Sequence, residues 1–263
     1  TAVHTFTADE SVTWSLNGGA DASQFSMASS GALNFSSAPD FENPTDSGSN
    51  NTYEVTVRAT DLSDNTSDQT VTVTVDNVSG SQTGGSGKDT LTGTSEEDTL
   101  SGLAGKDKLY GLAGDDTLNG GKGKDILNGG DGIDTAVFSS KSNKVDLRKT
   151  GRQNTKDGKD TLTNIENIDG GGGKDKITGS NGDNVLDGEG GKDTLKGKGG
   201  NDTLYGGSSK DKLYGNHGDD ILYGGAKKDI LKGGRGDDIL TGGLNTDVCY
   251  GGDGDDIFKM TRG

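Results

Sequence analysis

Acidic side chains recur at every ninth residue through much of the chain. From Gly84 the sequence divides without a gap into nonapeptides that begin with glycine, six of them ending at Val137 and ten more starting at Gly170. The sixth residue is aspartate in every repeat except one, which has asparagine. Calcium prefers hard oxygen ligands such as carboxylates. We therefore expect these sixth residues to bind calcium: Asp89, Asp98, Asp107, Asp116, Asp125, Asp134, Asp175, Asn184, Asp193, Asp202, Asp211, Asp220, Asp229, Asp238, Asp247 and Asp256.

The repeats follow the pattern G-G-x-G-x-D-x-U-x, as in GGRGDDILT from Gly233. Over residues 84–259 this pattern resembles the RTX proteins, whose calcium-binding nonapeptides form a parallel β-roll. The resemblance implies that six residues of each repeat form a calcium-binding turn and that three form a short strand. Glycine suits such turns because it adopts left-handed backbone angles and lets carbonyl oxygens approach an ion.

The length of the repeat predicts how the ions are arranged. Each nonapeptide is half a coil of the roll, so turns that are eighteen residues apart stack on one edge and hold an ion between them. The two blocks of repeats then accommodate roughly a dozen calcium ions. One apolar residue per repeat cannot offset the ordering of so many glycines. We therefore expect the chain to fold only when calcium is bound.

The eighth residue of each repeat is expected to point into the roll, because alternate residues of a strand face opposite sides. These residues are Leu91, Leu100, Leu109, Leu118, Leu127, Ala136, Ile177, Leu186, Leu195, Leu204, Leu213, Leu222, Leu231, Leu240, Cys249 and Phe258. Cys249, the single cysteine, is accordingly expected to be a small core residue and not a reactive thiol.

Some turns depart from the pattern at the fourth residue. Glu96, Ser209, Lys227 and Asn245 stand there in place of glycine. A side chain at this position is strained if the backbone requires a positive φ. We expect the turn that contains Lys227 to hold calcium weakly or not at all.

Composition excludes several classes of function. The net charge is −16 over 263 residues, which argues against nucleic acid as the main partner. The sequence lacks an apolar stretch long enough to span a membrane. His4 and His217 have no cysteine at ligand spacing, so zinc is not expected. We find no nucleophile–base pair and no phosphate-binding loop, and expect no enzymatic activity.

The N-terminal residues form a different module. YEVTVRA from Tyr53 and TVTVTV from Thr70 alternate apolar and polar residues, which predicts strands with one buried face and an antiparallel β-sandwich. The order of FTADESVTWSL, DFENP, YEVTVRATD and VTVTVDNV resembles bacterial cadherin-like domains without their first strand. The resemblance implies calcium ligation by Asp40, Glu42 and Asp61. The alternative is that these acids are ordinary turn residues that are exposed to solvent and bind no ion.

The sequence therefore predicts an all-β chain with five parts. A cadherin-like β-sandwich spans 1–79 and a linker spans 80–83. The first block of the β-roll spans 84–137, an irregular connecting segment 138–169, and the second block 170–263. In RTX proteins a segment like DGKDTLTNIE, found here from Asp157, links two blocks of repeats, so we expect a distorted continuation of the roll. A binding loop is the alternative.

Lysine precedes the aspartate in alternate repeats. Lys174, Lys192, Lys210 and Lys228 are eighteen residues apart, as are Lys88, Lys106 and Lys124. Since eighteen residues make one coil, these lysines are expected along one edge of the roll. They either moderate repulsion among carboxylates or bind an acidic polysaccharide or another protein. Tyr205 and Tyr223 are also one coil apart and either stack against sugars or pack on the surface.

Together these features favour a secreted, extracellular calcium-binding module. The expected parent protein is a bacterial adhesin or surface protein, exported by type I secretion, that adheres to cell surfaces or exopolysaccharide. One alternative is the noncatalytic tail of a secreted enzyme. Another is a calcium-dependent lectin that recognises acidic polysaccharide through the lysine edge.

Overall fold

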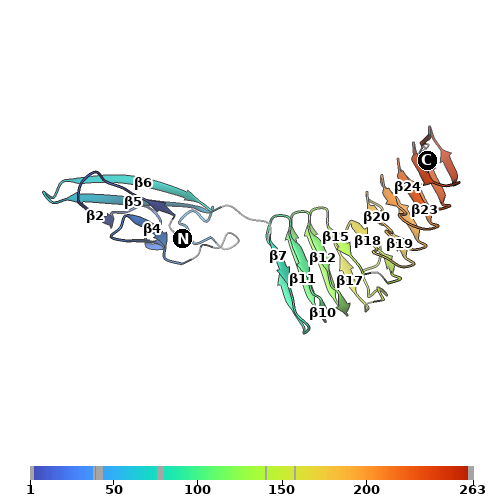
Figure 1. Ribbon diagram of the computed structural model, residues 1–263, viewed down its shortest axis with the longest axis horizontal. Helices are drawn as coiled ribbons and strands as arrows, with labels where there is room; N and C mark the ends of the chain where they lie inside the picture. Colours follow the sequence, from blue (N-terminus) through green and yellow to red (C-terminus); the bar gives the residue numbers. More distant parts are fainter. Residues whose placement is uncertain are drawn as a thin grey trace. The chain divides into compact units, whose positions relative to one another are not determined.

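The chain forms two compact units, Thr1–Val78 and Ser79–Gly263, in a computed structural model. The structure describes residues 3–37, 39, 44–75, 80–139, 141–156 and 158–259. Almost all of the regular structure in this part of the chain is β-strand (Figure 1). Among the described residues no helix has the length and apolar character needed to cross a membrane.

The N-terminal unit contains two small antiparallel sheets of three strands each. One sheet has the order β1 (His4–Thr5), β4 (Ala32–Phe35) and β3 (Phe25–Met27); the other has the order β2 (Val12–Leu16), β5 (Thr52–Asp61) and β6 (Thr66–Thr74). A 3-10 turn, η1 (Ala22–Gln24), precedes β3.

The two sheets share one core. Alternate residues of β5, namely Tyr53, Val55 and Val57, are buried, as the period of two predicts. The Tyr53 ring meets Phe35 of the other sheet edge-to-face, with 5.0 Å between centroids. The core of this unit is therefore built by β5 against aromatic residues of β3 and β4.

The C-terminal unit is a parallel β-solenoid, which confirms the predicted roll (Figure 1). One face is a ten-stranded sheet and the other carries a four-stranded and a six-stranded sheet. The ten strands are β7 (Ser81–Thr83), β9 (Thr99–Ser101), β12 (Thr117–Asn119), β15 (Thr135–Val137), β18 (Asn167–Asp169), β20 (Val185–Asp187), β22 (Thr203–Tyr205), β24 (Ile221–Ala226), β26 (Ile239–Leu244) and β28 (Ile257–Lys259).

The opposite face begins with the four-stranded sheet: β8 (Thr90–Thr92), β11 (Lys108–Ala113), β14 (Ile126–Asp131) and β17 (Thr161–Thr163). It continues with the six-stranded sheet: β16 (Lys144–Asp146), β19 (Lys176–Thr178), β21 (Thr194–Lys198), β23 (Lys212–His217), β25 (Ile230–Arg235) and β27 (Val248–Asp253). Two short strands at a turn edge, β10 (Ala104–Gly105) and β13 (Lys122–Gly123), also pair in parallel.

Neighbouring strands within the repeats pair in a register of eighteen residues, for example Leu204 with Leu222 and Leu213 with Leu231. The eighth residues therefore stack in columns, and those from Leu100 to Leu240 are buried in one continuous core. Cys249 packs against this core and is partly buried. Phe258 differs from the prediction: it is 53% exposed, because β28 is the terminal strand of its sheet.

The segment 138–169 continues the roll. Its strands β17 and β18 pair in parallel with β14 and β15 of the preceding coil, while β16 pairs with β19 of the following coil. Between β17 and β16, Gln153 and Asn154 form antiparallel bridges to Asp160 and Lys144. This antiparallel pair of residues joins the four-stranded sheet to the six-stranded sheet.

Residues 80–83 differ from the predicted linker. They contain β7, which pairs in parallel with β9 through Gln82 and Leu100. Because Ser81–Thr83 contains only polar residues and precedes the first glycine repeat, its role as the first strand of the roll was not visible in the sequence.

Candidate metal sites at the turns of the roll

The aspartates at the sixth position lie where each turn enters a strand, and most are buried. Asp202 and Asp220 are 1% and 0% exposed. The Asp202 backbone N–H donates to Oδ1 of Asp220 in the next coil at 2.8 Å, and the same bond joins Asp220 to Asp238. We call these repeated bonds the carboxylate ladder. One oxygen of each carboxylate thus fastens two coils together.

The second oxygen of these carboxylates lacks a hydrogen-bond partner. It is Oδ2 of Asp107, Asp116, Asp125, Asp134, Asp175, Asp193, Asp202, Asp211, Asp220, Asp229 and Asp238, and it is buried in each. A buried, ionised oxygen without a partner is strongly unfavourable. A bound cation would remove this cost.

Backbone carbonyls lie near these oxygens, since a Cβ added to Gly224, at the first position, would lie 2.5 Å from the carbonyl oxygen of Gly242 and 2.8 Å from Oδ2 of Asp229. A Cβ added to Gly225, at the second position, would lie 2.1 Å from the carbonyl oxygen of Gly207, and one added to Gly236, at the fourth, 2.2 Å from that of Gly218. The turns are therefore stacked so closely that one coil's carbonyls abut the next coil's Cα atoms. Carbonyl and carboxylate oxygens together form an all-oxygen donor set, which suits calcium.

Side chains alone do not complete such a site. In the part of the chain that the structure describes, no group of three or more His, Cys, Asp or Glu side chains could hold a metal. The ladder explains this result, since it supplies one carboxylate from each turn. The carbonyl oxygens of the stacked turns would have to provide the other ligands.

Burial raises the pKa of the ladder carboxyls. Loss of water, and after it the neighbouring carboxylate of Asp220, raise the pKa of Asp202 to about 7. The pKa of Asp220 is likewise raised to about 7, first by burial, and that of Asp116 to about 6. Without a cation, the ionised ladder therefore opposes the folded state.

The ladder passes through the irregular segment by way of residues that the sequence did not mark as candidates. Asp125 N–H donates to Oδ1 of Asp160 at 2.9 Å, and Asp134 N–H donates to Oε2 of Glu166 at 2.9 Å. A signal existed for Asp160, since Asp160-Thr161-Leu162 repeats the D-x-U end of the nonapeptide. Glu166 was harder to find because its longer side chain replaces the aspartate.

Asn184 keeps the ladder bond of its backbone N–H, which donates to Oδ1 of Asp202 at 2.9 Å, but its side chain differs from that of the aspartates. Its Nδ2 donates to the carbonyl of Glu166 at 2.6 Å, and its Oδ1 accepts from Ser180 N–H at 2.6 Å. The amide therefore satisfies both of its polar atoms with backbone groups. Among the sixth positions, Asn184 offers no charged oxygen to a cation.

The exceptions at the fourth position mostly have the expected backbone. Ser209, Lys227 and Asn245 have φ of 103°, 76° and 83°, whereas Glu96 is not among the residues with positive φ. Near Lys227, Asp229 still donates to Asp247 at 2.9 Å and keeps a buried, unpartnered Oδ2. A weak site at this turn stays a prediction.

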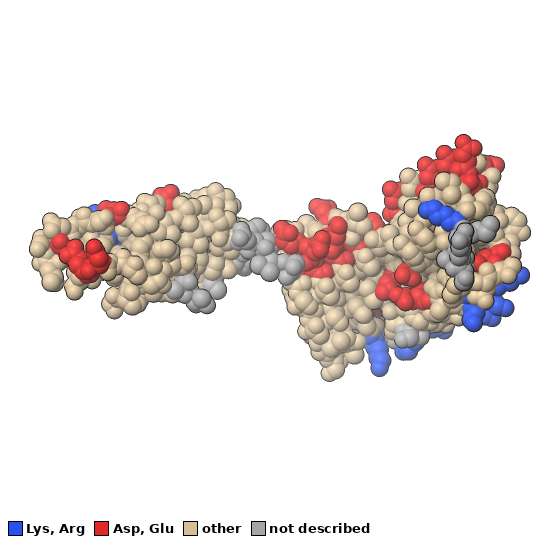
Figure 2. Space-filling model, turned by 45° about the horizontal axis from the view of Figure 1, so that its top comes forward, with Lys and Arg blue, Asp and Glu red and all other residues tan. Residues whose placement is uncertain are grey.

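The residues at the fifth position differ between the two edges. Lys174, Lys192, Lys210 and Lys228 precede strands of the six-stranded sheet, and none of them is buried. On the other edge, Asp237 N–H donates to Oδ1 of Asp219 at 2.7 Å, in the preceding coil. Acids gather along one margin of the roll in Figure 2, and basic side chains along another.

Of the three predicted calcium ligands in the N-terminal unit, Asp61 lies among the described residues and has structural partners. Asp61 accepts from Ser63 N–H at 2.8 Å and from Asn65 N–H at 2.9 Å, so it caps the turn between β5 and β6. The side-chain amide of Asn65 is the first cause that lowers the pKa of Asp61. Asp40 and Glu42 lie outside the described residues. Calcium binding by these three acids stays a prediction.

The repeats match a known protein family. The model of the RTX calcium-binding nonapeptide repeat matches six overlapping segments, which together cover residues 83–136 and 157–258. These residues make up more than half of the chain. No curated protein matches the chain. The matched residues include the carboxylate ladder and its continuation through Asp160 and Glu166.

Proposed function

Because the chain belongs to the RTX calcium-binding nonapeptide repeat family, we propose that calcium ions between stacked turns fold its C-terminal unit and hold it together. The observation that carries this proposal is the row of buried Oδ2 atoms without a partner. Calcium would satisfy these oxygens and offset both the burial and the carboxylate repulsion that raise the pKa of Asp202 and Asp220. Binding free energy would then become folding free energy.

A calcium titration of the metal-free protein tests this proposal. We expect circular dichroism to show a gain of β-structure as calcium is added, with a midpoint below the millimolar concentrations found outside cells. Magnesium is the control, because it demands a smaller octahedral site and retains its water. Strand content that is unchanged by calcium removal would contradict the proposal.

We further propose that the chain is a noncatalytic, extracellular part of a bacterial surface protein exported by type I secretion. A calcium-dependent roll suits this route because it would stay unfolded at low cytoplasmic calcium and fold outside. The N-terminal unit, with its two antiparallel sheets, fits a cadherin-like adhesion domain. Export of the parent protein through a type I system, and its loss when that system is deleted, would test the assignment.

A second candidate is the noncatalytic tail of a secreted enzyme. It is favoured by the C-terminal unit's separate compact fold, which needs no help from the N-terminal unit to build its core. A catalytic domain elsewhere in the parent protein would support its assignment as a secreted enzyme. Further cadherin-like domains would support its assignment as an adhesin.

A third candidate is a calcium-dependent lectin that uses the lysine edge. The accessibility of Lys174, Lys192, Lys210 and Lys228 favours it. A glycan array in calcium tests it. Binding of acidic polysaccharide that disappears when these four lysines are changed to glutamine would support it.

A further inference from the structure

The cations of the strands gather on one of the two faces of the roll. The strands of the six-stranded sheet contain six lysines and one arginine: Lys144, Lys176, Lys196, Lys198, Lys212, Lys232 and Arg235. The strands of the ten-stranded sheet contain one lysine, Lys259, and no arginine. In a chain with a net charge of −16, this separation leaves one face locally positive.

A pocket opens on this face where the antiparallel residues Gln153 and Asn154 meet the six-stranded sheet. It has a volume of 450 Å³. Its charged lining consists of one acid, Asp146, and seven cations: Lys144, Arg148, Lys149, Arg152, Lys176, Lys196 and Lys198. The pocket therefore carries a large positive excess.

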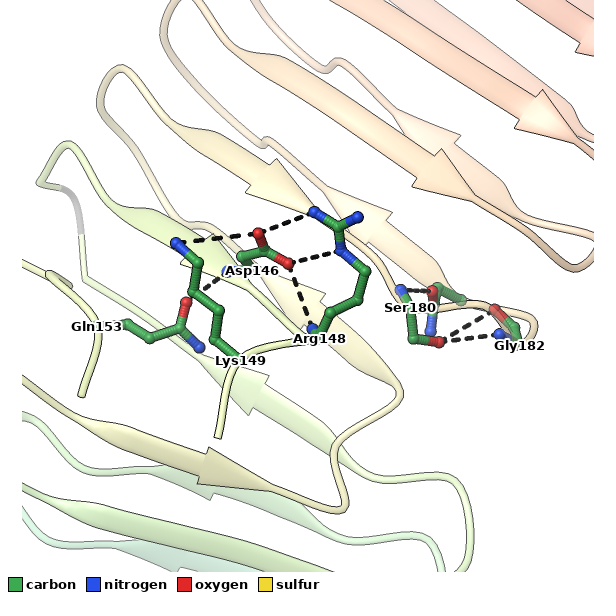
Figure 3. Close-up of polar contacts among 7 residues, drawn as sticks. Asp146, Arg148, Lys149, Gln153, Ser180 and Gly182 are labelled. Atoms are coloured by element: carbon green, nitrogen blue, oxygen red, sulfur yellow. Dashed lines mark hydrogen bonds and ion pairs between the residues drawn. The ribbon is translucent and has the colours of Figure 1, made fainter. Parts of the chain in front are cut away.

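Two of these cations are already paired with the acid. Arg148 forms a bidentate contact with Asp146, with Nε 3.0 Å from Oδ1, and Lys149 Nζ lies 4.0 Å from Oδ2 (Figure 3). The hydrogen bond from Arg148 is the first cause that lowers the pKa of Asp146. Lys144, Arg152 and the three lysines of β19 and β21 have no carboxylate within ion-pair distance among the described residues.

An aromatic column leads away from the pocket across the same sheet. Lys196, Tyr214, Lys232 and Tyr250 occupy the ninth position of successive strands and pair in register. The Lys196 Nζ lies 5.5 Å from the Tyr214 ring centroid, and Lys232 Nζ lies 5.3 Å from that of Tyr250. With the usual strand spacing, the two tyrosines are about 10 Å apart. Flat rings thus alternate with positive charges along a line perpendicular to the strands.

We propose that the pocket and the column, which we call the lysine–tyrosine face, bind a linear acidic polysaccharide. Its carboxylate or sulfate groups would meet Lys144, Arg152 and Lys176 in the pocket, and its sugar rings would lie along the column beside Tyr214 and Tyr250. A small anion would occupy the pocket but would leave the column without a role. A polymer with both charge and flat apolar faces uses the pocket and the column together.

This inference rests on the calcium-folded roll proposed above, and it places the glycan contact on the sheet and not on the lysine edge. The two surfaces can be separated by variants of equal charge. The sheet variant combines Lys144→Gln, Arg152→Gln, Lys176→Gln and Lys196→Gln. The matched edge variant combines Lys174→Gln, Lys192→Gln, Lys210→Gln and Lys228→Gln.

The test is a calorimetric titration of the full chain in saturating calcium with polygalacturonate, heparin and neutral dextran. We expect either acidic polymer to bind, dextran not to bind, and the sheet variant to bind at least about tenfold more weakly. The edge variant should bind as the parent does. Tyr214→Leu with Tyr250→Leu, which changes no charge, should also weaken binding. Preference for polygalacturonate or heparin identifies the carboxylate or the sulfate as the recognised group.

Several results would overturn the inference. These are unchanged binding by the sheet variant, an equal loss in the edge variant, or binding of single-stranded DNA as tight as that of the polysaccharides. Circular dichroism of each protein, with and without calcium, shows whether calcium folds it. A protein that folds with calcium but does not bind the polysaccharides would contradict this inference alone. If the sheet variant does not fold, Lys176→Gln alone and the double tyrosine variant provide the same comparison.

Discussion

The backbone N–H of Asp202 donates to Oδ1 of Asp220 at 2.8 Å, across one full coil of the roll. Asp220 keeps its other oxygen, Oδ2, buried and without a hydrogen-bond partner. One side chain thus joins two coils with one oxygen and offers the other to a cation. The carboxylate ladder and the candidate calcium sites are therefore built from the same residues.

Changing Asp220 to asparagine should separate these two roles. Asparagine keeps an oxygen that can accept from Asp202 N–H but loses the charge that would bind calcium. We expect a higher calcium midpoint for folding and a loss of about 1–3 kcal/mol of stability in calcium, measured by denaturant unfolding. The matched control is Asp219→Asn, because Asn201 already fills the equivalent exposed position of the preceding coil. An equal effect of both changes would contradict the ladder's role.

Acidity should affect the metal-free and the calcium-bound roll in opposite directions. The pKa of Asp202, Asp211 and Asp220 is raised by burial to about 7 from an ordinary value of 3.8. A raised pKa in the folded state stabilises that state below 3.8, and this stabilisation is lost as pH rises through about 7. Metal-free protein should therefore hold more structure at pH 5 than at pH 8.

Protons also compete with calcium for these oxygens. The calcium midpoint for folding should rise as pH falls from 8 to 5, when Asp202 and its neighbours become protonated. Circular dichroism of metal-stripped protein, titrated with calcium at several pH values, measures both trends. A calcium midpoint that does not change with pH would show that the ladder carboxyls do not bind the ion.

Two glycines at the same repeat position should respond differently to alanine. Gly218 has φ of 115°, and a Cβ there would lie 2.0 Å from the carbonyl oxygen of Gly200. Gly182 lacks a positive φ, and its nearest neighbour would be Ser180 Oγ at 3.8 Å. We expect Gly218→Ala to cost roughly 1–3 kcal/mol and Gly182→Ala to be nearly neutral. Thermal unfolding in calcium measures the difference, and similar melting of the two variants would refute it.

Glu166 should be needed to carry the ladder through the irregular segment. Glu166→Ala leaves the buried amide of Asp134 without its acceptor, at a cost of about 1–3 kcal/mol. Glu189→Ala is the control, because it removes the same charge from an exposed side chain. Hydrogen exchange of the Asp134 amide in calcium should be faster in the first variant. Unaltered protection of this amide would argue against the assignment.

The repeating part of the structure could be predicted from the sequence because each repeat has the same residue types at the same positions. Glycine marks the turn, aspartate begins the ladder, and residues such as Leu204 and Leu222 face inward at a fixed interval. The register of eighteen residues results directly from two repeats per coil. The columns of buried leucines were therefore visible from the sequence.

The repeat pattern did not predict the placement of residues whose burial or contacts depend on neighbouring segments. Phe258 has the inward position but lies in the terminal strand of its sheet, so its ring is exposed. Glu166 lies nine residues before Asp175, but it is not an aspartate and it precedes the glycine-led repeats, yet the fold brings its Oε2 to Asp134. Gln153 and Asn154 have no strand pattern and still bridge two sheets. These placements depend on contacts between segments far apart in the chain.

The bonds of the roll have a polarity that differs between its edges. On the lysine edge, each amide of the ladder depends on the carboxylate of a later coil, as Asp193 N–H depends on Asp211. On the acidic edge the ladder runs the same way, but a second row runs in the opposite direction, since Asp237 N–H donates to the earlier Asp219. Truncation from the C-terminal end thus strips acceptors from the last remaining coil on both edges. Truncation from the other end removes the acceptors of the exposed row and of those strand amides that donate to a carbonyl of the preceding coil, but it leaves the carboxylate ladder of the remaining coils intact. The ladder, and not the roll as a whole, therefore has a direction, which runs toward the C-terminus.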